Sequence, residues 1–283
     1  MLATLLIVFR EVIEAGLIVG IVLAATKGVP QRDLWVGYGV VAGVAGACLV
    51  AAFASEIGEL FQGSGQELFN AGILLLAVSM LTWHNVWMAS HGRAMAQEMR
   101  QVGAAVVAGR RPLAALSVVC GVAVLREGSE VVLFLYGIAV SGGTSAGMMA
   151  GGVLGLFAGA SVSALMYLGL LTIPAQYLFS VTSGLITLLA AGLAAQAVTS
   201  LQGGYVEFLT STVWDTSWLL SDNSVLGRLL HTLVGYTDRP SGAQLLVYLV
   251  TITVIVGLTR LKRPLVVPTK QSSRYPIPVL PGD

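Results

Sequence analysis

Charged side chains are scarce in this sequence: Asp, Glu, Lys and Arg together make up only 10% of its 283 residues. In soluble globular domains, about a quarter of the residues are charged. Apolar residues account for 56% of the chain, and the mean hydropathy is +0.85. The composition therefore excludes an ordinary soluble domain and predicts an integral membrane protein.

Several functional signals are also missing. The formal net charge is only +1, so the charge balance indicates no nucleic-acid partner. Cys48 and Cys120 both lie inside apolar segments, where we interpret them as small buried apolar side chains rather than a disulfide or a metal pair. No nucleophile elbow, phosphate-binding loop or zinc-protease helix occurs, so we expect a protein that is not an enzyme and that uses no organic cofactor.

The chain contains a set of long apolar runs. Each is long enough to cross the ~30 Å apolar core of a bilayer as a helix. Continuous runs are typical of helices, whereas barrel strands alternate. The sequence therefore predicts an all-α membrane protein with seven transmembrane helices, at roughly 1–26, 35–54, 68–90, 113–138, 147–170, 176–200 and 243–261.

The positions of Lys and Arg predict the orientation of these helices, because basic residues are enriched in cytoplasmic loops. If the N-terminus lies outside, the external connections hold only Arg228 and Arg239. The cytoplasmic connections and tail then hold Lys27, Arg32, Arg93, Arg100, Arg110, Arg111, Arg260, Lys262, Arg263, Lys270 and Arg274. We therefore expect the N-terminus outside and the C-terminus inside.

A five-residue motif occurs twice. Arg10–Glu14 reads REVIE and Arg126–Glu130 reads REGSE, each near the middle of its span. The third and sixth spans open alike, with QELF and QYLF, and the second and fifth spans both carry glycines four residues apart. Because three spans are an odd number, a second copy must enter the membrane the other way up, which predicts an inverted repeat.

This repeat defines the expected organisation. We predict one membrane domain over residues 1–263 and a disordered cytoplasmic tail over 264–283. Within the domain we expect repeat one at about 1–90, repeat two at about 113–200, a long external loop at about 201–242 and an extra seventh helix at about 243–261.

The repeated motif puts charge where a membrane helix has little. Two glutamates three residues apart share one helix face, and an arginine four residues before the second glutamate can pair with it. A charge at the bilayer centre costs about 2.5–3.5 kcal/mol, so these groups must face the bundle interior, pair, or hold a cation. Internal salt bridges are the plainer alternative, but two copies at matching depth favour a site for a hard cation. We predict metal ligands Glu11, Glu14, Glu127 and Glu130, supported by Arg10 and Arg126.

Arg-Glu-x-x-Glu in the first and fourth spans of a seven-span protein resembles the high-affinity iron permeases, the oxidase-dependent iron transporter family. The resemblance extends from Met1 to about Arg263. It implies that the motif glutamates bind and move iron, as Fe2+ or Fe3+, in a multi-pass protein of the bacterial inner membrane. It also implies a separate periplasmic iron-binding or oxidase protein as a partner, beside membrane lipid. A homo-oligomer is compatible with this resemblance.

Acidic residues gather on the predicted outer side. Glu56 and Glu59 repeat the three-residue spacing at the outer end of the second span, and we predict that they form an external receiving site. Histidines at the predicted cytoplasmic end of the third span suggest a release site, and aspartates in the long loop suggest contacts with a metal or a partner. These weaker candidates are His84, His91, Asp215 and Asp222.

Two alternatives remain open from the residues alone. The first is the same kind of transporter carrying another metal, such as lead or manganese. The second is a membrane sensor or scaffold that binds metal without moving it.

Overall fold

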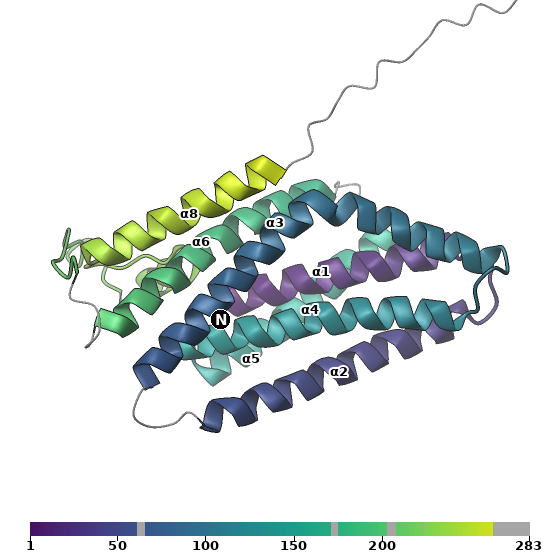
Figure 1. The fold of residues 1–283 in the computed structure, drawn as a ribbon, viewed down its shortest axis with the longest axis horizontal. Helices are drawn as coiled ribbons and strands as arrows, with labels where there is room; N and C mark the ends of the chain where they lie inside the picture. Colours follow the sequence, from purple (N-terminus) through teal and green to yellow (C-terminus); the bar gives the residue numbers. More distant parts are fainter. Residues whose placement is uncertain (61–65, 171–174, 203–207, 223, 263–283) are drawn as a thin grey trace, which may run out of the picture.

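The computed structural model describes residues 1–60, 66–170, 175–202, 208–222 and 224–262. These residues form eight α-helices and no strand beyond one isolated bridge between Thr212 and Ser241. The helices are α1 (Leu2–Ala25), α2 (Arg32–Leu60), α3 (Gln66–Val107), α4 (Ala114–Val140), α5 (Ser145–Tyr167), α6 (Ala175–Gln202), α7 (Val225–Val234) and α8 (Gly242–Lys262). Figure 1 shows the long helices side by side in one bundle. The expected disordered tail, 264–283, lies outside the described residues.

Five helices contain a segment long and apolar enough to cross a membrane: Arg32–Ala54, Glu67–Gly92, Ser145–Tyr167, Phe179–Gln202 and Gly242–Lys262. α1 and α4 are of similar length, 24 and 27 residues, but each carries an arginine and two glutamates near its middle. A continuous helix satisfies its own backbone groups, as lipid requires. The chain is therefore an all-α membrane protein, and each of the seven predicted spans falls on a long helix.

α3 is much longer than the span predicted at 68–90. It continues to Val107 and comprises 42 residues, which at 1.5 Å per residue is about 63 Å, roughly twice the apolar thickness of a bilayer. The added residues are mostly good helix formers such as Ala, Met, Gln, Glu and Arg, and no proline occurs between Gln66 and Pro112. Hydropathy marks where a helix leaves the apolar layer, not where the helix ends. The connection expected after residue 90 is in fact largely helical.

Glycines set the closest helix contacts. α1 packs along α5, and α2 packs along α4. A Cβ atom added at Gly155 in α5 would lie only 2.6 Å from the carbonyl oxygen of Leu5, and one at Gly43 in α2 would lie 2.7 Å from that of Gly121. In lipid, the hydrophobic effect does not drive apolar helices together. Close backbone contact at small residues instead provides the van der Waals packing that holds them.

Two apolar clusters occupy different ends of the bundle interior. The first includes Ile7 of α1, Leu81 of α3 and Phe134 of α4. The second includes Val22 of α1 and Leu116 of α4. Both repeated motifs lie between these positions in the sequence of α1 and α4, so the charged residues are enclosed between two apolar layers.

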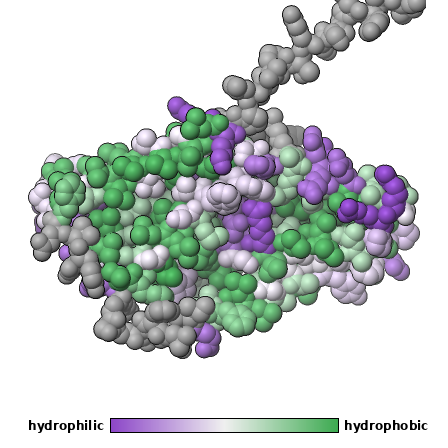
Figure 2. Space-filling model, viewed as in Figure 1, coloured by the Kyte–Doolittle hydropathy of each residue, from purple (hydrophilic) through white to green (hydrophobic). Residues whose placement is uncertain are grey.

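The outer surface is mainly apolar. Figure 2 shows hydrophobic side chains over most of the visible face, with hydrophilic patches near one end and at mid-length. Tyr38 and Phe53 of α2 and Phe157 of α5 are among the large apolar side chains left exposed. Such a surface would promote aggregation in water but is suited to contact with lipid tails.

Candidate metal site

The first motif lies on the buried face of α1. Arg10, Glu11 and Glu14 are 1%, 1% and 3% exposed. Charged side chains are almost never buried to this degree unless they are paired or coordinate a metal. The α1 face that packs into the bundle therefore carries a concentrated set of charges at its centre.

The second motif meets the first from α4, which contacts α1 and runs in the opposite direction (Figure 1). Glu127 and Glu130 are 2% and 8% exposed. The Arg126 side chain is 33% exposed, and its guanidinium lies over the ring of Trp87, 4.4 Å from the ring centroid. The two copies thus converge, although their arginines have different surroundings.

Each arginine pairs with the second glutamate of its own motif, as the four-residue spacing predicts. Arg10 Nε lies 2.9 Å from Glu14 Oε1, and Arg126 Nε lies 3.2 Å from Glu130 Oε1. The neighbouring first glutamates are farther away: the distance is 3.8 Å from Arg10 to Glu11 and 4.0 Å from Arg126 to Glu127. In each motif, therefore, the arginine holds one carboxylate more closely than the other.

His84 of α3 lies at the centre of this arrangement. Its Nε2 is 3.2 Å from Glu14 Oε2, and its Nδ1 contacts Glu130 Oε2. It is 1% exposed, whereas His91 is exposed and stacks on Trp87 with ring centroids 5.1 Å apart. His84 therefore lies with the glutamates, and a release site formed by His84 and His91 stays a prediction.

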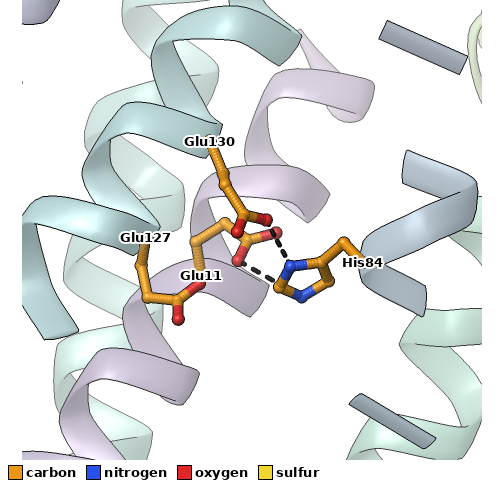
Figure 3. Close-up of side chains that lie close together, drawn as sticks. All are labelled: Glu11, His84, Glu127 and Glu130. Atoms are coloured by element: carbon orange, nitrogen blue, oxygen red, sulfur yellow. Dashed lines mark ion pairs between the residues drawn. The ribbon is translucent and has the colours of Figure 1, made fainter. Parts of the chain in front are cut away.

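Four side chains offer ligand atoms close together. One atom each from Glu11, His84, Glu127 and Glu130 lies within 4.8 Å of all the others. Figure 3 shows these groups pointing toward one another from α1, α3 and α4. Opposite ligands of a small octahedral cation are about 4 Å apart, so modest side-chain shifts would let carboxylates of this cluster surround a single ion.

Unsatisfied oxygens make the cluster suitable for a cation. Both carboxylate oxygens of Glu11 and one oxygen each of Glu14, Glu127 and Glu130 are buried and have no hydrogen-bond partner among the described residues. The oxygens of Glu14 and Glu130 lie in ion pairs with Arg10 and His84. A buried polar atom without a partner costs about 1–3 kcal/mol, and more when it is charged. A bound cation would remove this cost, and carboxylate oxygens with an imidazole nearby suit first-row transition metals.

The predicted external receiving site is only partly described. Glu56 is exposed near the end of α2, whereas the Glu59 side chain lies outside the part of the chain that the structure describes. Glu56 does not belong to the cluster of metal-ligand atoms found among the described residues. The pair therefore stays a prediction.

The loop aspartates have structural partners. Asp215 lies 3.0 Å from Arg239, and the hydroxyl and backbone N–H of Ser217 donate to it, which lowers the pKa of that carboxyl. Asp222 and Asp238 each donate a backbone N–H to the other's carboxylate, at 3.2 and 3.1 Å. Burial raises the pKa of Asp222, and the charge of Asp238 adds to the rise. These contacts account for both aspartates without a metal ion.

Apolar helices of membrane-spanning length around a buried carboxylate cluster define a polytopic membrane protein whose interior could hold a cation. The family model described as "Iron permease FTR1 family" matches residues 1–270. This chain therefore belongs to the FTR1 iron permease family, a family of transporters rather than enzymes, and it is a multi-pass membrane protein.

Bacterial relatives agree with this assignment. The chain is 31% identical to "Ferrous iron permease EfeU" of Yersinia pestis over 255 residues, covering 88% of this chain and 90% of the relative. It is also 31% identical to the protein of that name from Escherichia coli O6:K15:H31, covering 88% and 92%. The Yersinia pseudotuberculosis protein is 32% identical over 250 residues, with 87% of each chain covered. No solved structure matches this chain.

Proposed function

We propose that this protein moves iron across the bacterial cytoplasmic membrane into the cell, through a mid-membrane site formed by Glu11, Glu14, Glu127 and Glu130. The family gives iron as the substrate. The observation that carries the proposal is the burial together of both motifs, with carboxylate oxygens of Glu11 and Glu127 that lack hydrogen-bond partners among the described residues.

Electrostatics favours a cation in this place. Four carboxylates and two guanidiniums leave an excess of negative charge when all are ionised, and like charges this close repel. Charges at the middle of a membrane are usually functional for this reason. A multivalent cation offsets the repulsion. When the ion has left, Arg10 and Arg126 limit the negative charge of the empty site.

The two apolar clusters support a transporter that changes conformation rather than an open pore. Ile7 and Phe134 lie toward one end of α1 and α4, and Val22 and Leu116 toward the other, with the glutamates between. An ion in the site would be closed off from both sides. Transport then requires one cluster to open at a time, as in alternating access.

An inverted repeat is part of this proposal, with the N-terminus outside. Leu5 lies five residues before Arg10, and Gly121 lies five residues before Arg126. The carbonyl oxygens of these two residues are the ones that approach the equivalent glycines, Gly155 and Gly43. Corresponding carbonyls therefore meet corresponding glycines in α1–α5 and α4–α2, which supports two structurally related halves.

The outer surface would serve delivery. We place an external receiving site at Glu56 and Glu59. The segment around 201–242, which includes α7, would be the docking surface for a separate periplasmic iron-binding or oxidase protein. Both assignments rest on the predicted orientation and on the acidic character of that side.

Iron flux into liposomes tests the proposal. Purified protein should accumulate radiolabelled iron, and unlabelled manganese or lead in excess should compete only weakly. Neutral, nearly isosteric changes Glu11→Gln and Glu127→Gln should lower uptake at least about tenfold each. Iron binding without uptake by the unaltered protein would instead identify a sensor, and stronger competition by another metal would reassign the substrate.

A further inference from the structure

We propose that the two glutamates of each motif have different tasks. Glu11 and Glu127 bind the cation, whereas Glu14 and Glu130 are positioning residues that His84 ties together. This inference rests on the proposed function and deepens it, because it says which carboxylates the ion meets and which hold the helices.

The second glutamates are engaged at both oxygens. Glu14 Oε1 pairs with Arg10 at 2.9 Å, and its Oε2 lies 3.2 Å from His84 Nε2. Glu130 repeats this arrangement, with Oε1 at 3.2 Å from Arg126 and Oε2 in contact with His84 Nδ1. The result is a continuous chain of ion pairs, arginine–glutamate–histidine–glutamate–arginine, that crosses from α1 through α3 to α4.

The first glutamates lie outside this chain. The ion pairs of Glu11 are 3.8 Å to Arg10 and 3.9 Å to His84, and that of Glu127 is 4.0 Å to Arg126. These separations exceed hydrogen-bond distance. Both side chains are almost fully buried, and their ligand atoms lie in one cluster with those of His84 and Glu130. Their lone pairs are therefore available to a cation, whereas those of Glu14 and Glu130 point to fixed cationic partners.

His84 acts through the second glutamates in this arrangement. Each of its ring nitrogens faces a carboxylate, one from each motif, so both nitrogens already have a partner within the protein. From α3, His84 also contacts both motifs. It is thus placed to hold α1 and α4 in register while the two halves rearrange around the ion.

Transport kinetics in liposomes separate the two tasks. The matched variants are E11Q and E127Q for the ligands, and E14Q, E130Q and H84Q for the bridge. E11Q and E127Q should raise the iron concentration for half-maximal uptake about tenfold or more. E14Q, E130Q and H84Q should lower the maximal rate about tenfold while leaving the half-maximal concentration within about threefold. A similar loss of affinity in all four glutamate-to-glutamine variants would overturn the division of tasks, even with iron transport by the unaltered protein intact.

A second measurement needs no variant to fold. X-ray absorption of Fe2+ bound to the unaltered protein should show oxygen ligands without the outer-shell scattering of an imidazole, and H84Q should give the same spectrum. Imidazole scattering would overturn the bridging role of His84. Because this spectrum depends on binding alone, it tests the inference even if the protein binds iron without moving it.

Discussion

At the scale of single residues, the two motif arginines hold equivalent places in the sequence and unequal places in the structure. Arg10 is 1% exposed and enclosed by its glutamates. Arg126 is 33% exposed and lies against Trp87. Removing a partner from a buried ion pair leaves an uncompensated charge, whereas solvent and the neighbouring ring moderate the loss at a more open position.

Arg10→Met should therefore destabilise the protein by about 3–5 kcal/mol, and Arg126→Met should destabilise it clearly less. Both changes remove the guanidinium and keep an unbranched apolar stem, so the pair is its own control. The thermal unfolding midpoint of the detergent-solubilised protein measures the difference. Equal midpoints for the two variants would mean that the two arginines are equivalent after all.

Asp222 gives a pH-dependent prediction outside the membrane. Burial and Asp238 raise its pKa above the ordinary value of about 3.9, against an opposing effect of His231. A raised pKa means that the folded segment prefers the protonated carboxyl. The stability that this preference contributes is fully present below pH ~3.9 and is lost as the pH rises through the folded pKa.

Hydrogen exchange of residues 208–222, corrected for the intrinsic effect of pH, should therefore show better protection at pH 4 than at pH 7. Asp222→Asn should remove most of that difference, because its amide oxygen can still accept the Asp238 N–H while carrying no charge. An unchanged pH dependence in this variant would show that another group is responsible.

His84 shows what residue patterns cannot supply. The motif glutamates could be predicted because they repeat with fixed spacing at matching depth. The sequence groups His84 with His91 rather than with the glutamates, and only the approach of α3 to α1 and α4 places His84 between Glu14 and Glu130. The one available signal was a polar residue inside a predicted span, which by itself indicates function without naming the partner.

At the scale of helices, close glycine contacts fix how α5 lies on α1 and how α2 lies on α4. The glycine spacing was visible in the sequence, and its packing role follows from the physics of helices in lipid. The length of α3 was not visible in hydropathy, because its polar second half leaves the apolar layer without leaving the helix.

Gly155→Ala should destabilise the protein by about 1–3 kcal/mol, because the added methyl group would meet the backbone of α1. Gly72→Ala in α3 is the matched control. Nothing lies within 4 Å of a Cβ atom at Gly72, so alanine should be neutral or stabilise the helix by about 0.5–1 kcal/mol. Thermal midpoints compare the two, and a neutral Gly155→Ala would contradict the close α1–α5 packing.

At the scale of the whole molecule, the proposed transport depends on two halves of opposite orientation that enclose one site. The long helices were predictable because each predicted span is a continuous apolar run or a run interrupted only by the motif. The convergence of the motifs was expected from the predicted repeat, since a pseudo-two-fold axis in the membrane would bring equivalent mid-depth segments together. The enclosure of the site by two apolar clusters was not predictable, because it depends on which helices pack together.

The orientation gives a direct prediction. In a background with Cys48 and Cys120 changed to alanine, Ser145→Cys should react with a membrane-impermeant maleimide added outside intact spheroplasts. Ala108→Cys, a matched small and exposed position, should react only after the membrane is permeabilised. The reverse labelling pattern would place the N-terminus inside and overturn the direction of transport proposed here.

The most direct test of the central claim is to locate iron in the iron-loaded protein by anomalous scattering at the iron absorption edge. We expect an iron peak between the carboxylates of Glu11 and Glu127, close to the middle of the helices, and its loss in the E11Q/E127Q double variant. Iron found only at the outer acidic residues, or unchanged at mid-depth in the double variant, would contradict a mid-membrane glutamate site.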